Sequence, residues 1–239
     1  MRLRFTGMAV AAALVLLSGL DGHIVAAPSA AMASLAKLKA GNARFVGSPQ
    51  DALPVDAGRR TALAKGQTPF ATLLSCADSR VPPEIVFHTG LGDLFVVRAA
   101  GNVTDKAILA SIEYSVEHLN VPLVVVMGHE SCGAVKAAID TPVGQSLGPN
   151  LDYLVSQIRP SVNATASKPE AERMRAAILA NVEESLNDML AGSAILREFG
   201  KEGKVAFVGA YYELASGKAY FSEPVAPPPT EPHSTGGHQ

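Results

Sequence analysis

The amino-acid sequence predicts an α/β protein whose mostly parallel central sheet has four strands, a C-terminal edge hairpin and flanking helices. Three observations support this prediction. Four short apolar runs, rich in branched side chains, recur along the chain, and segments with apolar residues at helical spacing separate them. The chain has 239 residues, of which 48% are hydrophobic, so one sizeable core can be buried.

The predicted strands are the apolar runs at residues 70–75, 94–98, 123–127 and 205–211. Their apolar residues are continuous rather than alternating with polar ones, which is typical of parallel strands that are covered on both faces. Beyond the last run, two short segments at residues 211–214 and 218–221 flank an Ala-Ser-Gly tripeptide. This pattern favours a terminal hairpin at the sheet edge.

Helices are predicted at residues 105–119, 132–139, 151–158, 170–191 and 194–200. In the first of them, apolar residues from Ile108 to Leu119 recur at helical spacing, and Thr104 is the expected N-cap. The segment 170–191 is rich in Ala, Glu and Leu, which favours a long helix. Because strands and helices alternate, we expect a parallel sheet with crossover helices.

The first part of the chain has the pattern of a secretory leader. Arg2 and Arg4 precede an apolar run from Met8 to Leu20, which is shorter than the roughly 20 apolar residues of a membrane span. The small residues Ala31 and Ala33 then supply a cleavage site before Ser34. We therefore expect a signal peptide at residues 1–33 and a periplasmic or secreted location in a bacterium, with no membrane span.

One domain is expected to follow, at residues 34–222. From residue 223 onward the chain is rich in Pro and Gly and has almost nothing apolar to bury, so residues 223–239 are expected to be a disordered tail. The formal net charge is −2 and the basic residues are scattered, which argues against a nucleic-acid partner.

The chain contains two cysteines, Cys76 and Cys132. In an exported protein, two cysteines are first interpreted as one disulfide. However, each of them follows an apolar run at the point where a polar turn begins, and His129 stands three residues before Cys132. In an α/β sheet the carboxyl ends of the strands are where ligands and catalytic groups gather.

Two thiolates and one imidazole would leave a fourth coordination position open. That number of protein ligands is typical of a catalytic zinc rather than a closed structural one, and thiolates select zinc over magnesium or calcium. The sequence therefore favours a zinc site formed by Cys76, His129 and Cys132 over a disulfide.

These same segments carry a resemblance to a known family. SCADSRVPPE at residues 75–84 and GHESCGAV at residues 128–135 resemble the two zinc-ligand signatures of β-class carbonic anhydrases. GDLFVVRAAGNV at residues 92–103 is similar to the central strand and loop of that family, and LKAGNARFV at residues 38–46 to its leading helix. The loop at residues 99–102 departs from the commoner Asn-rich version.

The resemblance implies a lyase that catalyses the reversible hydration of carbon dioxide to bicarbonate through zinc-bound hydroxide, with one zinc ion per subunit. It also implies a homodimer or a dimer of dimers, with the active site near the subunit interface. Asp78 and Arg80 would form a dyad in which the guanidinium keeps the carboxylate ionised and oriented. The sequence leaves open whether water or Asp78 fills the fourth zinc position at rest.

The resemblance further implies a substrate pocket. Gln67, in GQTPF at residues 66–70, matches a family branch in which this side chain contacts the substrate from across the dimer interface. Phe95 and Tyr114 stand where that branch places apolar pocket walls, although ordinary core packing would also explain them. His88 and His118 are candidate proton shuttles, because an imidazole titrates near neutral pH.

Two other functions remain open at this point. The same fold and metal could hydrolyse carbonyl sulfide or carbon disulfide, since access to the pocket decides between such substrates. Alternatively, the chain could be a non-catalytic zinc-binding or thiol-redox protein. The absence of a C-x-x-C motif argues against thioredoxin-like exchange, and Asp78 and Arg80 argue against a purely structural zinc.

Overall fold

Five strands form one sheet in the computed structural model, which describes residues 29–228. Their order across the sheet is β2-β1-β3-β4-β5. The first four strands are parallel, and β5 runs antiparallel to β4. The strands are β1 (Ala71–Ser75), β2 (Leu94–Arg98), β3 (Leu123–His129), β4 (Ala206–Tyr212) and β5 (Ala219–Phe221). The predicted fold class, including the edge hairpin, is confirmed.

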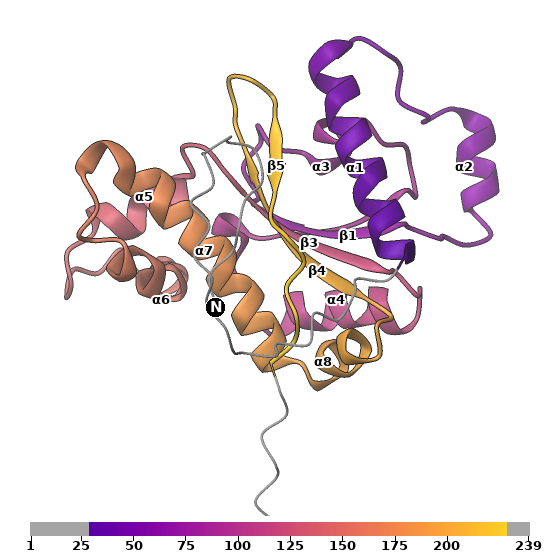
Figure 1. Ribbon diagram of the computed structural model, residues 1–239. Helices are drawn as coiled ribbons and strands as arrows, with labels where there is room; N and C mark the ends of the chain where they lie inside the picture. Colours follow the sequence, from indigo (N-terminus) through magenta and orange to yellow (C-terminus); the bar gives the residue numbers. More distant parts are fainter. Residues whose placement is uncertain (1–28, 229–239) are drawn as a thin grey trace, which may run out of the picture.

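Helices connect the parallel strands and pack against the sheet (Figure 1). They are α1 (Ser29–Gly47), α2 (Ala57–Leu63), α3 (Pro83–Val86), α4 (Lys106–Glu117), α5 (Gly133–Asp140), α6 (Pro149–Ala164), α7 (Glu170–Gly192) and α8 (Ala194–Lys201). The short helices α2 and α3 have no counterpart among the helices expected from periodicity, because they are too short to show a repeat. Local signals begin them instead: the Asp56 side chain caps α2, and Pro83 opens α3.

The N-cap predicted for α4 is wrong by one residue. The helix begins at Lys106 and its N-cap is Asp105, whose carboxylate accepts a hydrogen bond from the Ile108 amide at 2.9 Å. Thr104 precedes the cap and is buried. Both residue types cap helices well, so the sequence alone did not separate them.

The sheet is buried on both faces, as the continuous apolar runs predict. Leu73 and Val125 belong to the core on the side of α1, α3 and α5, whereas Leu74 and Val124 belong to the core under α4 and α8. The long helix α7 contributes to both cores. Figure 1 shows α2 on one side of the molecule and the α5–α6 pair on the other.

Parallel pairing brings the ends of β1 and β3 to the same edge of the sheet. Ser75, the last residue of β1, stands beside Met127 of β3, so Cys76 follows at the level where β3 continues to Gly128 and His129. This carboxyl edge is where an open α/β sheet binds ligands.

Regular structure extends beyond both predicted boundaries of the domain, residues 34 and 222. The helix α1 starts at Ser29, upstream of the predicted cleavage site, and Ala31 within it is fully buried. At the other end, the Val225 amide donates to the Phe207 carbonyl at 2.8 Å, so backbone pairing extends past residue 222. Residues 1–28 of the predicted leader (1–33) and residues 229–239 of the predicted tail (223–239) lie outside the described residues. Between residues 29 and 228 no helix is long and apolar enough to cross a membrane.

Candidate metal centre

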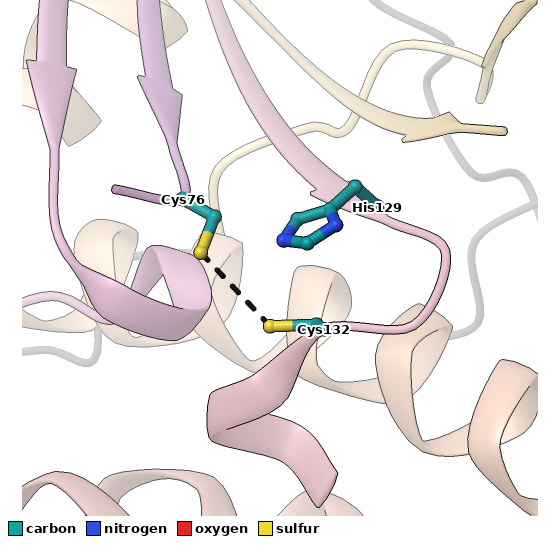
Figure 2. Close-up of side chains that lie close together, drawn as sticks. All are labelled: Cys76, His129 and Cys132. Carbon is teal, nitrogen blue, oxygen red and sulfur yellow. Dashed lines mark hydrogen bonds between the residues drawn. The ribbon is translucent and has the colours of Figure 1, made fainter. Parts of the chain in front are cut away.

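Three potential metal ligands converge at the carboxyl edge of the sheet. The sulfur atoms of Cys76 and Cys132 and one ring nitrogen of His129 all lie within 4.8 Å of one another. The two sulfurs are 4.0 Å apart, so the cysteines are free thiols rather than a disulfide (Figure 2). All three side chains are buried. The structure thus brings together the three residues that the sequence predicts as ligands.

Each ligand is placed by the end of a regular element. Cys76 directly follows β1, His129 is the last residue of β3, and Cys132 is the N-cap of α5. Between the last two, Ser131 has a φ of 54°, a left-handed conformation that turns the chain sharply from strand to helix. Figure 2 shows the three side chains pointing into the space between these elements.

The histidine has one free ring nitrogen, and it belongs to this site. His129 Nδ1 lies 2.9 Å from the Glu130 carbonyl oxygen, which can only accept, so Nδ1 carries the proton. His129 Nε2 is therefore a lone-pair donor; it is buried and has no hydrogen-bond partner. A buried polar atom without a partner is costly unless a ligand satisfies it. Two sulfurs and this nitrogen fit a zinc ion and leave one position open.

The pKa values of the two thiols are shifted in opposite directions. The hydrogen bond with Cys132 lowers the pKa of Cys76 to about 4, against the effect of burial, and contacts from His129 and the amides of Asp78 and Gly101 act in the same direction. Those amides lie 3.4 Å and 3.3 Å from the sulfur. Cys76 and burial raise the pKa of Cys132 well above its ordinary value. Without metal, the pair therefore holds one proton at neutral pH.

Beside the ligands, Asp78 and Arg80 form an ion pair. Arg80 Nε donates to Asp78 Oδ1 at 2.9 Å and Arg80 Nη2 donates to Asp78 Oδ2 at 2.7 Å. These hydrogen bonds hold the pKa of Asp78 far below its usual range, although partial burial opposes them. Asp78 Oδ2 lies 3.9 Å from His129 Nε2, so the carboxylate reaches the ligand cluster.

Sequence reasoning missed a second group of residues that support the ligands. Arg98 bonds the carbonyls of Cys76 and Asp78, and the Gly101 amide bonds the Cys76 sulfur. On α7, the Asn181 amide group donates to the Gly101 carbonyl at 2.6 Å. The resemblance covered Arg98 and Gly101 without assigning them a role, whereas nothing local marks Asn181.

Glu130 supports the histidine from the other side. Its amide donates to the Tyr212 carbonyl at 2.8 Å, and its carboxylate accepts from the Leu214 amide at 2.9 Å. The turn after β3 is thereby tied to the turn after β4. The carbonyl of Glu130 that orients His129 is consequently fixed in place.

The three residues predicted to form the substrate pocket lie away from the potential metal ligands of the same chain. Gln67 is exposed and precedes β1, at the sheet edge opposite to Cys76. Phe95 pairs with Thr72 near the start of β1, and its ring lies 6.2 Å from that of Tyr114. A single chain does not bring these residues to its own metal ligands. The prediction for Gln67 invoked a neighbouring subunit and stays a prediction.

The two candidate proton shuttles are also separate from the cluster. His88 is buried in the connection between α3 and β2, with no partner for its Nε2 atom. His118 is the C-cap of α4, exposed, with its ring 5.1 Å from that of Tyr114. Neither joins the group of potential metal ligands among residues 29–228.

Comparisons with known proteins agree on one family. A family model described as carbonic anhydrase matches residues 71–219. Carbonic anhydrase 2 of Mycobacterium tuberculosis is 45% identical over 185 residues, which cover 76% of this chain and 88% of the relative. The carbonic anhydrase of Mycolicibacterium smegmatis is 40% identical over 182 residues, with the same coverage of 76% and 88%.

Solved structures show the same similarity. A β-carbonic anhydrase from Coccomyxa, solved with acetazolamide, superposes with a TM-score of 0.63 and 27% sequence identity. The match covers 69% of this chain and 76% of the Coccomyxa chain. One of two tetrameric β-carbonic anhydrases from Sordaria macrospora superposes with a TM-score of 0.61 and 26% sequence identity. The match covers 79% of this chain and 94% of the Sordaria chain.

Proposed function

Because this chain belongs to the β-class carbonic anhydrase family, we propose that it catalyses the reversible hydration of carbon dioxide to bicarbonate and a proton, with one zinc ion held by Cys76, His129 and Cys132. The observation that carries this proposal is the buried group of two sulfurs and one unpartnered imidazole nitrogen. Its three donors fit zinc and leave a coordination position for a reacting molecule.

Zinc supplies one piece of chemistry: it lowers the pKa of a bound water to about 7, so that a strong nucleophile exists at neutral pH. The chain supplies the orientation. Asp78, kept ionised by Arg80, accepts a hydrogen bond from the nucleophile and directs its lone pair toward carbon dioxide. His129 stays in one tautomer because Glu130 accepts the proton of Nδ1.

Arg80 also supports an open site. Both oxygens of the Asp78 carboxylate accept hydrogen bonds from Arg80, whose Nη2 further lies 3.3 Å from the Ser131 carbonyl oxygen. A carboxylate bound in this way is turned toward the guanidinium. We therefore propose that Asp78 acts as a hydrogen-bond acceptor rather than as the fourth ligand at rest.

We propose that the substrate pocket is completed by a second subunit. Gln67 would then contact the substrate from the partner, with Phe95 and Tyr114 as apolar walls, in a homodimer or a dimer of dimers. Two observations support this: these residues are remote from the metal ligands of their own chain, and the Sordaria relative is tetrameric.

We also propose that the protein is exported, with a leader at residues 1–33, a carbonic anhydrase domain at 34–222 and a tail at 223–239. The basic start and the apolar run from Met8 to Leu20 support a leader. A cut after Ala33 would remove the first five residues of α1, including the buried Ala31.

A paired measurement tests the catalytic proposal. Purified protein should contain about one zinc per chain by elemental analysis and should accelerate carbon dioxide hydration in a stopped-flow pH-indicator assay. Less than half a zinc per chain without hydration above the buffer rate would overturn the proposal. Bound zinc without hydration would indicate a zinc-binding protein that is not a carbonic anhydrase.

A further inference from the structure

Arg98 contacts the backbone of the segment that carries the first predicted zinc ligand, Cys76. It is the last residue of β2 and is half-buried. Arg98 Nε donates to the Cys76 carbonyl at 2.9 Å, and Arg98 Nη2 donates to the Asp78 carbonyl at 2.6 Å. One guanidinium thus holds the backbone of both a metal ligand and the acceptor carboxylate.

The parallel pairing of β1 and β2 makes this contact possible. Ser75 stands beside Arg98, and the Ala99 amide donates to the Ser75 carbonyl at 3.1 Å. The Ala77 amide returns a hydrogen bond to the Ala99 carbonyl at 3.1 Å, so the ladder continues past the last paired residue. Because this ladder uses the backbone groups of Ser75 and Ala77, it leaves the carbonyls of the alternate residues Cys76 and Asp78 to the Arg98 side chain. The planar guanidinium reaches them with two separate nitrogens, Nε and Nη2, whereas a lysine ammonium has a single nitrogen.

The charge of Arg98 is directed at these carbonyls alone. Among residues 29–228 no carboxylate pairs with Arg98, unlike Arg59, Arg80 and Arg175. Half-burying a cation without an acidic partner is costly unless its hydrogen bonds are well placed. The two acceptors in this case belong to the residues on which the chemistry depends.

The continuation of β2 also holds the sulfur. The Gly101 amide lies 3.3 Å from Cys76 Sγ, and Asn181 fixes the Gly101 carbonyl from α7. Two further backbone contacts hold the segment: the Asp78 amide donates to the Cys76 sulfur, and the Val81 amide donates to the Asp78 carbonyl. Among the described residues, the Cys76 carbonyl has Arg98 as its partner.

We propose that Arg98 is a positioning residue, which fixes the distance between the Cys76 sulfur and the Asp78 carboxylate by holding the backbone on both sides of Ala77. This inference rests on the proposed function, because it concerns how the same site is kept in a productive geometry. Arg98 does not need to contact the substrate or the metal.

The test compares Arg98→Met with wild type and with Arg197→Met as a matched control. Arg197 also donates to two backbone carbonyls, those of Leu190 and Ala191 at 2.6 Å and 2.7 Å, but between α7 and α8. Three quantities are measured on each protein: kcat/KM for hydration, the rate of zinc loss to a chelator, and the visible d–d spectrum of the cobalt-substituted protein, which reports coordination geometry.

For Arg98→Met we expect kcat/KM to fall and zinc loss to accelerate, each by about 10- to 100-fold, the range found when a residue supporting a metal ligand is removed. The cobalt spectrum should change as well. Arg197→Met should keep the wild-type spectrum and zinc-loss rate. A wild-type spectrum and kcat/KM in Arg98→Met, or equal effects in both variants, would overturn the proposal.

If Arg98→Met does not fold, Arg98→Lys tests the positioning role of Arg98 instead. It keeps the charge but replaces the planar fork by a single ammonium nitrogen, so it should fold while its cobalt spectrum differs from wild type and its zinc-loss rate is raised. Wild-type values for Arg98→Lys would show that charge alone is sufficient and would refute the positioning role. The cobalt spectrum and zinc loss do not depend on hydration, so failure of the proposed function would be seen separately, as an inactive wild type.

Discussion

Arg80 donates two parallel hydrogen bonds to the carboxylate of Asp78, at 2.9 Å to Oδ1 and 2.7 Å to Oδ2. One residue, Ser79, separates them in the sequence. The Arg80 backbone amide also donates to Oδ1 at 2.9 Å. Asp78 is therefore an ionised acceptor whose orientation is fixed from one side. Its other side faces His129 Nε2 at 3.9 Å, within reach of a molecule bound in the site.

Asp78→Asn should leave zinc bound but strongly reduce hydration. The amide has nearly the same shape but carries no charge, so it is a poor acceptor for the nucleophile. We expect kcat/KM to fall by about 100-fold or more, while elemental analysis still gives about one zinc per chain. Asp140→Asn is the control, because this exposed carboxylate on the surface of α5 pairs with Lys136 and with no other side chain in the described part of the chain. Full activity in Asp78→Asn would refute the role assigned to Asp78.

Zinc affinity should depend on pH in a defined direction. The pKa of Cys76 is lowered to about 4 by its hydrogen bond with Cys132, whose own pKa is raised above its ordinary value. The metal-free pair thus holds one proton near neutral pH, which zinc must displace. Affinity should rise about tenfold per pH unit between roughly pH 7 and 8.5, measured by chelator competition. A pH-independent affinity would mean that both thiols are already ionised in the metal-free protein.

Gly128→Ala should destabilise the fold beside the metal ligands. A Cβ atom at Gly128 would lie 2.7 Å from Val182 Cγ2 and 3.0 Å from Ile178 Cγ2, on the helix α7 that packs against β3. Overpacking of this kind costs about 1–3 kcal/mol of unfolding free energy, measured by urea denaturation of the zinc-loaded protein. Gly47→Ala is the matched control, because a Cβ there meets nothing within 4 Å. Equal stability of the two variants would contradict the contact.

The mature N-terminus should be measurable by intact mass after export from a bacterial host. The proposed leader predicts a start at Ser34. A start at or upstream of Ser29 would instead keep α1 whole and retain the buried Ala31. A full-length mass for all of the protein, recovered from the cytoplasm, would refute export.

Much of the site was predictable because its residue types are chemically distinctive. Cysteine and histidine at the ends of two apolar runs indicated zinc, and Asp78 and Arg80 are close enough in sequence to be recognised as a pair. The four parallel strands were also predictable, since continuous apolar runs indicate burial on both faces. By contrast, Asn181 and Arg98 support the site through contacts between elements that no local pattern reveals.

The sequence by itself determined the donor set, the four buried strands with their longer connecting helices, and the edge of the sheet at which the ligands gather. Only the tertiary structure decided which nitrogen of His129 is free, because that depends on the carbonyl of Glu130. It also decided that Arg98 holds the Cys76–Asp78 segment and that Gln67 lies at the far edge. Local patterns reflect burial and periodicity, whereas hydrogen bonds between distant segments form only when packing brings those segments together.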